Sequence, residues 1–80
     1  MGVEKVQEVF QEVFGKRDLR IFPEMTAKQV ANWDSFNHIN LIIALEEAFG
    51  ISFATEEMAE MANVGDLIKI LQKKGHDVSW

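Results

Sequence analysis

The chain has 80 residues, which is enough for one domain with one small hydrophobic core. Its 13 Asp and Glu residues outnumber its 8 Lys and Arg residues, and the net charge of −5 disfavours nucleic-acid binding and favours partners with basic surfaces. The absence of cysteine excludes disulfides and thiolate metal sites, and the longest apolar run, from Leu41 to Leu45, is far too short to span a membrane.

Apolar residues recur at helical spacing near the N-terminus. Val3, Val6, Phe10 and Val13 follow one another at intervals of three, four and three residues, and Gly15 lies just beyond them. This pattern predicts an amphipathic helix that ends at the glycine. Because the same stretch lacks the layout of a signal peptide, we expect a cytoplasmic protein.

Residues 16–34 are predicted to form a long loop, because they contain the only proline and no sustained hydrophobic period. Several apolar residues can hold this loop against the helices: Leu19, Ile21, Phe22, Met25 and Val30. A connection of this length is unusual in so small a domain unless it has a function. The loop and its end therefore become the first place to look for a site.

A second helix is predicted from Ser35 to Phe49, with Asp34 as its N-cap and Gly50 at its end. Its sequence is apolar around most of the helical circumference, so we expect it to be the central helix of the fold. Asp34 and Ser35 then lie where the long loop becomes this helix.

Two further helices complete the prediction. Thr55, Glu56 and Glu57 resemble the capped start of a short helix that runs to about residue 61. Asn63 caps a last helix that ends at Gly75 and buries Val64, Leu67, Ile68 and Leu71. We predict an all-α four-helix bundle with a long first loop and a short third helix, formed by residues 1–75, and a flexible tail at residues 76–80.

The pair Asp34–Ser35 is the strongest chemical signal. A serine in the first turn of a helix has an exposed hydroxyl, and the free N–H groups and positive dipole end there favour a phosphate. Asp34 can cap the helix and also contact magnesium or basic groups of a modifying enzyme. The simpler alternative is that Asp34 is only an N-cap and Ser35 only a suitable first-turn residue.

From Val3 to Leu71 the chain resembles the acyl carrier proteins in helix order, loop length, the Asp34–Ser35 pair and the stretch from Leu41 to Gly50. The resemblance implies that a phosphopantetheinyl transferase attaches 4'-phosphopantetheine from coenzyme A to Ser35, with Asp34 beside it. Acyl groups would then be carried as thioesters to acyl-activating, condensing or acyltransferase enzymes of fatty-acid, polyketide or other specialised biosynthesis. We expect a monomeric carrier and not an enzyme, because His38 and His76 have no nucleophile and orienting group in a catalytic pattern.

Asn37, Asn40, Ala44 and Glu47 form one stripe on the second helix, which predicts the face that meets solvent and partners. The family carries carboxylates where Asn37 and Asn40 stand, so electrostatic docking should be weaker near the serine. The expected recognition residues are Phe36, Asn37, Asn40, Glu47 and Glu57. For the glutamates, an ordinary solvated face is the alternative.

An acyl pocket is the second feature that the resemblance implies. In the family the region between the second, third and fourth helices can open to shelter an acyl chain. The matching candidates are Ile39, Ile43, Met58, Met61 and Leu67, and methionine makes an adaptable lining. The alternative for each of these residues is simple core packing.

Two departures from the family pattern keep other functions open. Asn32 stands where the family has glycine and Phe36 where it has leucine, while Trp33-Asp34-Ser35 resembles discrete carriers of specialised pathways. An aminoacyl or D-alanyl carrier fits equally well, and an unmodified helical interaction module with the same fold is the alternative from another class. A helix-turn-helix DNA binder is disfavoured by the acidic charge and the lack of a basic recognition helix.

Overall fold

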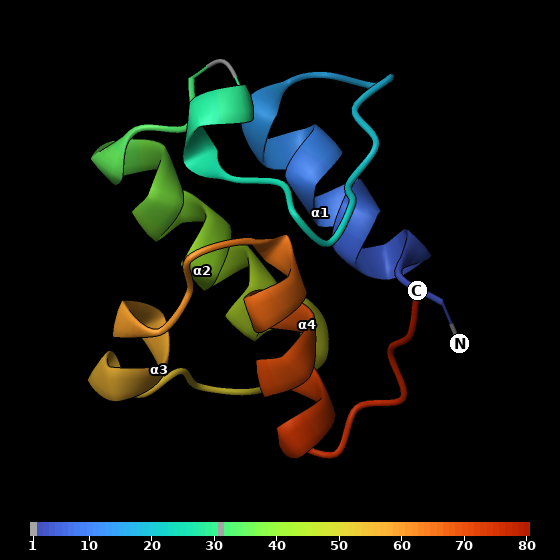
Figure 1. Ribbon diagram of the computed structural model, residues 1–80, viewed down its shortest axis with the longest axis vertical. Helices are drawn as coiled ribbons and strands as arrows, with labels where there is room; N and C mark the ends of the chain where they lie inside the picture. The colour runs from blue at the N-terminus through green and yellow to red at the C-terminus, as the bar shows by residue number, and fades with distance from the viewer. Residues whose placement is uncertain (1, 31) are drawn as a thin grey trace.

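Four α-helices and one short 3-10 helix make up the fold in the computed structural model, which describes residues 2–30 and 32–80 (Figure 1). The order is α1 (Glu4–Phe14), η1 (Ala27–Gln29), α2 (Ser35–Phe49), α3 (Thr55–Ala59) and α4 (Val64–Lys73). The described residues contain no strand beyond an isolated bridge between Gly2 and Ser79, which brings the two ends of the chain together. The predicted all-α bundle is confirmed.

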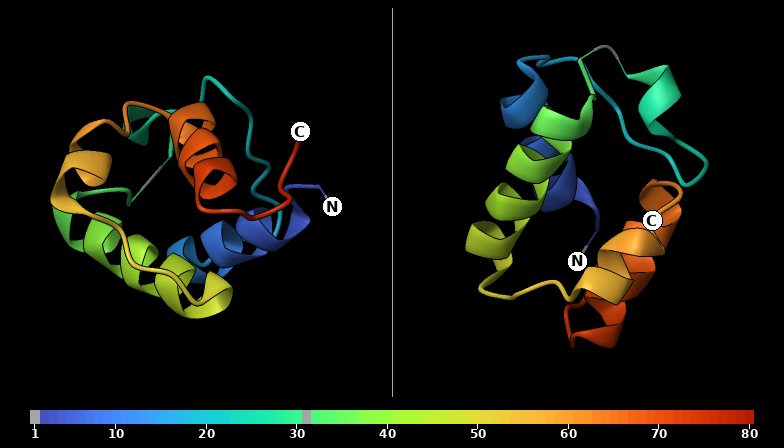
Figure 2. Two further views of the ribbon diagram at one scale, coloured as in Figure 1. Left: turned by 90° about the horizontal axis from the view of Figure 1, so that it is seen from below. Right: turned by 90° about the vertical axis from the view of Figure 1, so that its left-hand side faces the viewer.

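Helix α1 buries one face, formed by Val6, Val9, Phe10 and Phe14, against the core. It ends as predicted at Gly15, which has a left-handed φ of 65° and donates its N–H to the carbonyl of Gln11. Glycine adopts this conformation without the steric cost that a side chain would bring. Helices α1 and α2 pack side by side, with α4 across from them (Figure 2).

Helix α2 has the predicted bounds, but it is buried on one side only. Leu41, Ile42 and Leu45 enter the core, whereas Ile39 and Ile43 are 59% and 48% exposed. A helix that is apolar all round does not reveal which of its faces is covered. The apolar circumference from which we expected a central helix is therefore only partly covered in the structure.

The long loop after α1 is fixed to the helices at several points. Ile21 donates its backbone N–H to the Gln7 side chain at 3.1 Å. The carbonyls of Pro23 and Met25 accept from the N–H groups of Gly65 and Val64 at the start of α4, each at 2.9 Å. Ile21, Met25 and Val30 are buried, while Phe22 stays exposed. The loop thus joins α1 to α4 and holds the entry to α2.

Helices α3 and α4 begin at different kinds of cap. Asn63 caps α4 as predicted, because its side chain accepts the N–H of Asp66 at 2.9 Å. Helix α3 ends at Ala59, earlier than the predicted residue 61, and its N-cap is Ala54, whose N–H donates to Glu57 at 2.8 Å. A helix of five residues has no hydrophobic period from which its end could be predicted. No helix among the described residues has the length and apolar character needed to cross a bilayer.

Residues after α4 make contacts with the bundle. The Val78 side chain is buried in the core, and the Gln72 side chain donates to the Val78 carbonyl at 2.7 Å. The His76 ring packs edge-on against Phe49 with ring centroids 5.1 Å apart. The predicted tail is therefore partly packed, because Val78 supplies an apolar side chain to the core. The domain boundary at residue 75 stays a prediction.

Candidate functional site

Ser35 is the first residue of α2, and its side chain is exposed. Asp34 before it is extended, and its Oδ1 accepts the backbone N–H of Asn37 at 2.8 Å. The Asp34 carbonyl accepts from His38, also at 2.8 Å. The cap therefore engages the N–H groups of Asn37 and His38 and leaves those of Ser35 and Phe36 for an incoming anion. The predicted arrangement of a fixed backbone with an exposed hydroxyl is present.

The turn before the serine depends on Asn32. Its φ is 71°, in the left-handed region that glycine adopts freely and that asparagine tolerates better than most residues. The Asn32 carbonyl accepts from the Asp34 N–H at 3.0 Å and from the Asn37 side-chain amide at 2.7 Å. Asn32 can therefore occupy the position at which the resemblance to the family implies a glycine, and the Asn37 side chain holds the Asn32 backbone in place.

Asn37 and Asn40, expected on the partner face, form a hydrogen-bonded chain with this turn. The Asn40 side-chain amide donates to Asn37 Oδ1 at 3.2 Å, and the Asn37 side-chain amide in turn donates to the backbone carbonyl of Asn32. Asn37 is half-buried and Asn40 is exposed. A carboxylate at position 37 has no donor and could not make the bond to Asn32. The structure thus gives Asn37 a role within the chain.

Trp33 and His38 form a contact that the sequence patterns did not suggest. The Trp33 Nε1–H donates to His38 Nδ1 at 3.1 Å, and the two rings are stacked with an interplanar angle of 17°. Trp33 also packs against Phe10 and Phe14, with centroid distances of 5.5 and 5.6 Å. His38 is therefore half-buried rather than a plain surface residue of the helix. Trp33 and His38 are five residues apart across the helix cap, and this spacing matches no helical period. The only sign of the contact in the sequence was an aromatic residue directly before Asp34 and Ser35.

Two hollows lie beside this pair. The serine groove, of about 540 Å³, is open and is lined by Ala27, Trp33, Asp34, Ser35, His38 and Ile39. The inner cavity, of about 80 Å³, is lined by Ala27, Trp33, His38, Leu41, Met61, Ala62, Asn63, Val64 and Leu67. Ala27, Trp33 and His38 belong to both hollows. The groove that begins at Ser35 therefore adjoins a cavity that reaches the core.

The predicted pocket residues are distributed over three places. Met61 and Leu67 line the inner cavity, and Ile39 lines the serine groove. Ile43 and Met58 line neither hollow and are 48% and 36% exposed. The structure therefore does not bring these two to the cavity. The face of α2 that turns inward carries Leu41 and Leu45 instead of Ile43, and Met58 is exposed on α3.

An apolar stripe is exposed on α2 on the side away from the core. Phe36, Ile39 and Ile43 recur at intervals of three and four residues, and Phe36 is 73% exposed. The exposed Glu47 lies further along the same helix. Of the expected recognition residues on α2, Phe36, Asn40 and Glu47 are therefore accessible to a partner. The stripe itself was missed, because Ile39 and Ile43 were expected to face inward.

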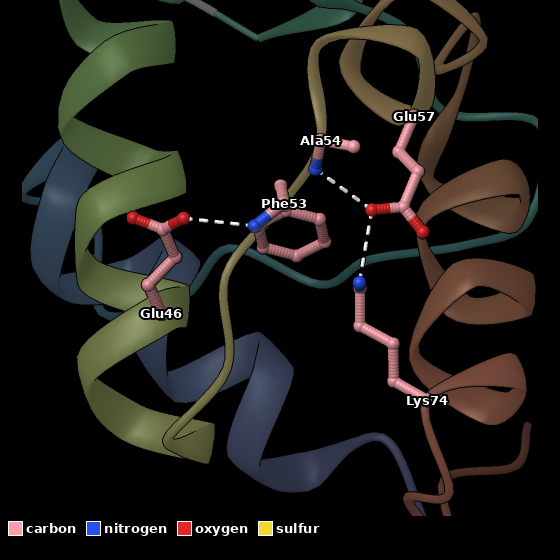
Figure 3. Close-up of polar contacts among 5 residues, drawn as sticks. All are labelled: Glu46, Phe53, Ala54, Glu57 and Lys74. Carbon is pink, nitrogen blue, oxygen red and sulfur yellow. Dashed lines mark hydrogen bonds and ion pairs between the residues drawn. The ribbon is translucent and has the colours of Figure 1, made fainter.

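Glu57 is engaged within the chain (Figure 3). Its Oε1 accepts the Ala54 N–H at 2.8 Å and lies 2.9 Å from Lys74 Nζ. The hydrogen bond from Ala54, and then Lys74, lower the pKa of the Glu57 carboxyl. Nearby, Glu46 Oε2 accepts the Phe53 N–H at 2.9 Å. Lys74 already neutralises Glu57, which makes Glu57 a poorer electrostatic contact for a partner than its sequence position predicted.

Comparisons with known proteins agree with a carrier of the acyl-carrier class. No protein-family model matches the chain. The acyl carrier protein of Helicobacter pylori (strain ATCC 700392 / 26695) is 32% identical over 69 residues, which are 86% of this chain and 88% of that protein, and the protein of strain G27 matches to the same extent. The solution NMR structure of a holo acyl carrier protein from Geobacter metallireducens is 30% identical, with a TM-score of 0.84 over 98% of this chain and 97% of that one. The chain belongs to the acyl carrier protein family, whose members are carriers and not enzymes.

Proposed function

We propose that this protein carries acyl groups as thioesters on a 4'-phosphopantetheine group attached to Ser35. The observation that carries the proposal is the exposed Ser35 hydroxyl on the capped first turn of α2, at the edge of a groove that adjoins an inner cavity. The similarity to a protein whose structure is described as holo supports the same cofactor here.

The residues around Ser35 fit this group. The N–H groups of Ser35 and Phe36 and the positive end of the α2 dipole favour a phosphate at the serine oxygen. Asp34 uses Oδ1 for the cap, which leaves its second oxygen for magnesium or a basic group of the modifying enzyme. In the modification, the Ser35 oxygen bonds to the pantetheine-side phosphorus of coenzyme A, the bond to the nucleotide phosphate breaks, and the hydroxyl proton passes to a base of the transferase.

The bound group would supply the thiol, because the chain has no cysteine of its own. We propose that a phosphopantetheinyl transferase and acyl-activating, condensing or acyltransferase enzymes of fatty-acid or related biosynthesis are the partners. The apolar stripe of Phe36, Ile39 and Ile43 supports docking on α2, with Glu47 adding an acidic contact. Met61 and Leu67 support acyl binding in the inner cavity.

The proposal is tested by intact-mass measurement after incubation with coenzyme A, magnesium and a promiscuous phosphopantetheinyl transferase. We expect one added phosphopantetheine on the wild type and on Ser52→Ala, which alters another exposed serine, and none on Ser35→Ala. No addition to a wild type that retains its helical circular-dichroism spectrum, with several transferases, would favour an unmodified interaction module. Addition to Ser35→Ala would place the group on another residue.

A further inference from the structure

The two hollows beside Ser35 are separated by a wall of two side chains. Ala27 belongs to both hollows, but it is small, so the wall consists mainly of the rings of Trp33 and His38. On the outer side lie Asp34, Ser35 and Ile39. A group that is attached at Ser35 and enters the inner cavity from the serine groove must therefore pass these two rings.

This wall is held closed by a hydrogen bond and by packing. The Trp33 Nε1–H donates to His38 Nδ1 at 3.1 Å, which requires that Nδ1 carry no proton. Trp33 comes from the loop and rests on Phe10 and Phe14 of α1, whereas His38 is held by α2. The bond therefore joins two elements that can separate without unfolding either helix, and breaking it shifts an equilibrium by about fivefold.

The remaining walls of the inner cavity are less able to move. Leu41, Val64 and Leu67 are buried core residues. Asn63 is committed to the α4 cap through its bond to Asp66. Met61 is half-buried and has a flexible side chain, and it lies with the exposed Ala62 between α3 and α4, so this segment is the competing place where the cavity can enlarge.

The size of the inner cavity sets which acyl groups fit while Trp33 and His38 are hydrogen-bonded. A cavity of about 150 Å³ holds a benzene ring of six carbons. By the same ratio, the inner cavity of about 80 Å³ holds about three carbon atoms. Its walls of Leu41, Met61 and Leu67 favour an apolar tail such as that of a butyryl group.

We propose that Trp33 and His38 determine cargo specificity: while they are hydrogen-bonded, the inner cavity admits short apolar acyl groups and excludes long ones. This inference rests on the proposed function, since it concerns cargo that is attached at Ser35. Two variants remove the bond with little loss of packing. Trp33→Phe keeps a ring against Phe10 and Phe14 but has no donor, and His38→Leu removes the acceptor.

The first test loads the wild type and both variants with acetyl, butyryl, hexanoyl and octanoyl pantetheine phosphate, and checks each product by intact mass. For the wild type we expect a raised Tm and slower thioester hydrolysis with acetyl and butyryl only. Trp33→Phe and His38→Leu should extend this protection to hexanoyl and octanoyl, with hydrolysis slowed about fivefold relative to the wild type. The double variant should match either single variant, because each removes the same hydrogen bond.

Val9→Ala is the control, because Val9 is a buried core residue of α1 that lines neither hollow. It should lower the Tm without changing the dependence on acyl length. The inference is overturned if the wild type and both wall variants show the same length dependence, or if Val9→Ala changes it as much as they do. A change that appears only in Met61→Ala would assign selection to Met61 instead.

A second test does not require attachment at Ser35, so it separates failure of this inference from failure of the proposed function. The unmodified protein is titrated with S-butyryl- and S-octanoyl-N-acetylcysteamine while the methyl resonances of Leu41 and Leu67 are followed by NMR. In the wild type only the butyryl compound should shift them, and in Trp33→Phe both compounds should. Equal shifts from both compounds in the wild type, or no shift in any variant, would overturn the inference.

Discussion

The hydrogen bonds between side chains at the serine end of α2 differ from those around α3. At the serine end, beside the Asp34 cap, two neutral amides support the turn: Asn40 donates to Asn37, and Asn37 donates to the carbonyl of Asn32. Around α3, carboxylates make the contacts. Glu46 accepts the Phe53 N–H, and Glu57 accepts from Ala54 and pairs with Lys74 (Figure 3).

This difference predicts different responses to solution conditions. Amide hydrogen bonds do not titrate and depend little on salt, whereas a carboxylate with a lysine partner responds to both. The amide bonds among Asn32, Asn37 and Asn40 should therefore stay constant while the attachment of α3 varies. In both places, polar side chains that the sequence pattern assigned to partners also serve the fold.

Among the variants that test this difference, Asn37→Ala is expected to have the largest effect on stability. It leaves the Asn32 carbonyl without its side-chain donor at 2.7 Å, and we expect the free energy of unfolding to fall by about 1 kcal/mol. Modification at Ser35 should slow as well, because the turn before it loses a support. Urea denaturation and transferase kinetics measure the two effects.

Asn40→Ala is the control for that change, since Asn40 is exposed and its bond to Asn37 is longer, at 3.2 Å. It should cost clearly less stability than Asn37→Ala. Adding 0.5 M salt should leave the Asn37→Ala difference unchanged. Equal losses from the two variants, or a loss that disappears in salt, would contradict a structural role for the Asn37 amide.

Local signals explain why much of this fold could be predicted from the sequence. Gly15, Asp34, Gly50 and Asn63 act within one turn of the helix that each bounds, so the caps appear in the sequence itself. Ser35 was found in the same way, because the first turn of a helix is a local feature. The buried position of Val78 could not be predicted from local signals, because it depends on contacts that the bundle makes only once it is folded.

The side of α2 that is buried could not be predicted from the hydrophobic pattern of that helix alone, for a related reason. Leu41, Ile42 and Leu45 are no more apolar than Ile39 and Ile43, so the period alone does not choose the buried side. The choice comes from the positions of α1 and α4. The bond between Trp33 and His38 depends on the same packing, because the loop brings the indole to α2 only when Phe10 and Phe14 support it.

A smaller effect is expected from reversing the accessible charge on α2. Glu47→Lys should slow modification at low salt by about two- to fivefold, because the exposed Glu47 is free to attract a basic partner surface. Glu8→Lys makes the same change of net charge on the exposed side of α1 and should leave the rate unchanged. Equal slowing by both variants would point to net charge alone rather than to docking on α2.

The smallest effect, and the one that completes the comparison, is the pH dependence of Glu57→Gln. The pKa of Glu57 is lowered in the folded protein by the Ala54 N–H and by Lys74, so the folded state favours the ionised carboxylate. Its contribution to stability is therefore present above the pKa of the unfolded chain and is lost as the pH falls through the lowered folded pKa. The wild type should have a higher Tm than Glu57→Gln at neutral pH, and this difference in Tm should shrink towards acid pH. It should also shrink in high salt, because Lys74 is half-exposed and its charge is screened. If the Glu57→Gln difference kept its size at acid pH, the carboxylate charge would not be what fastens α3 to α4, and the contrast with the neutral amide bonds beside Ser35 would fail.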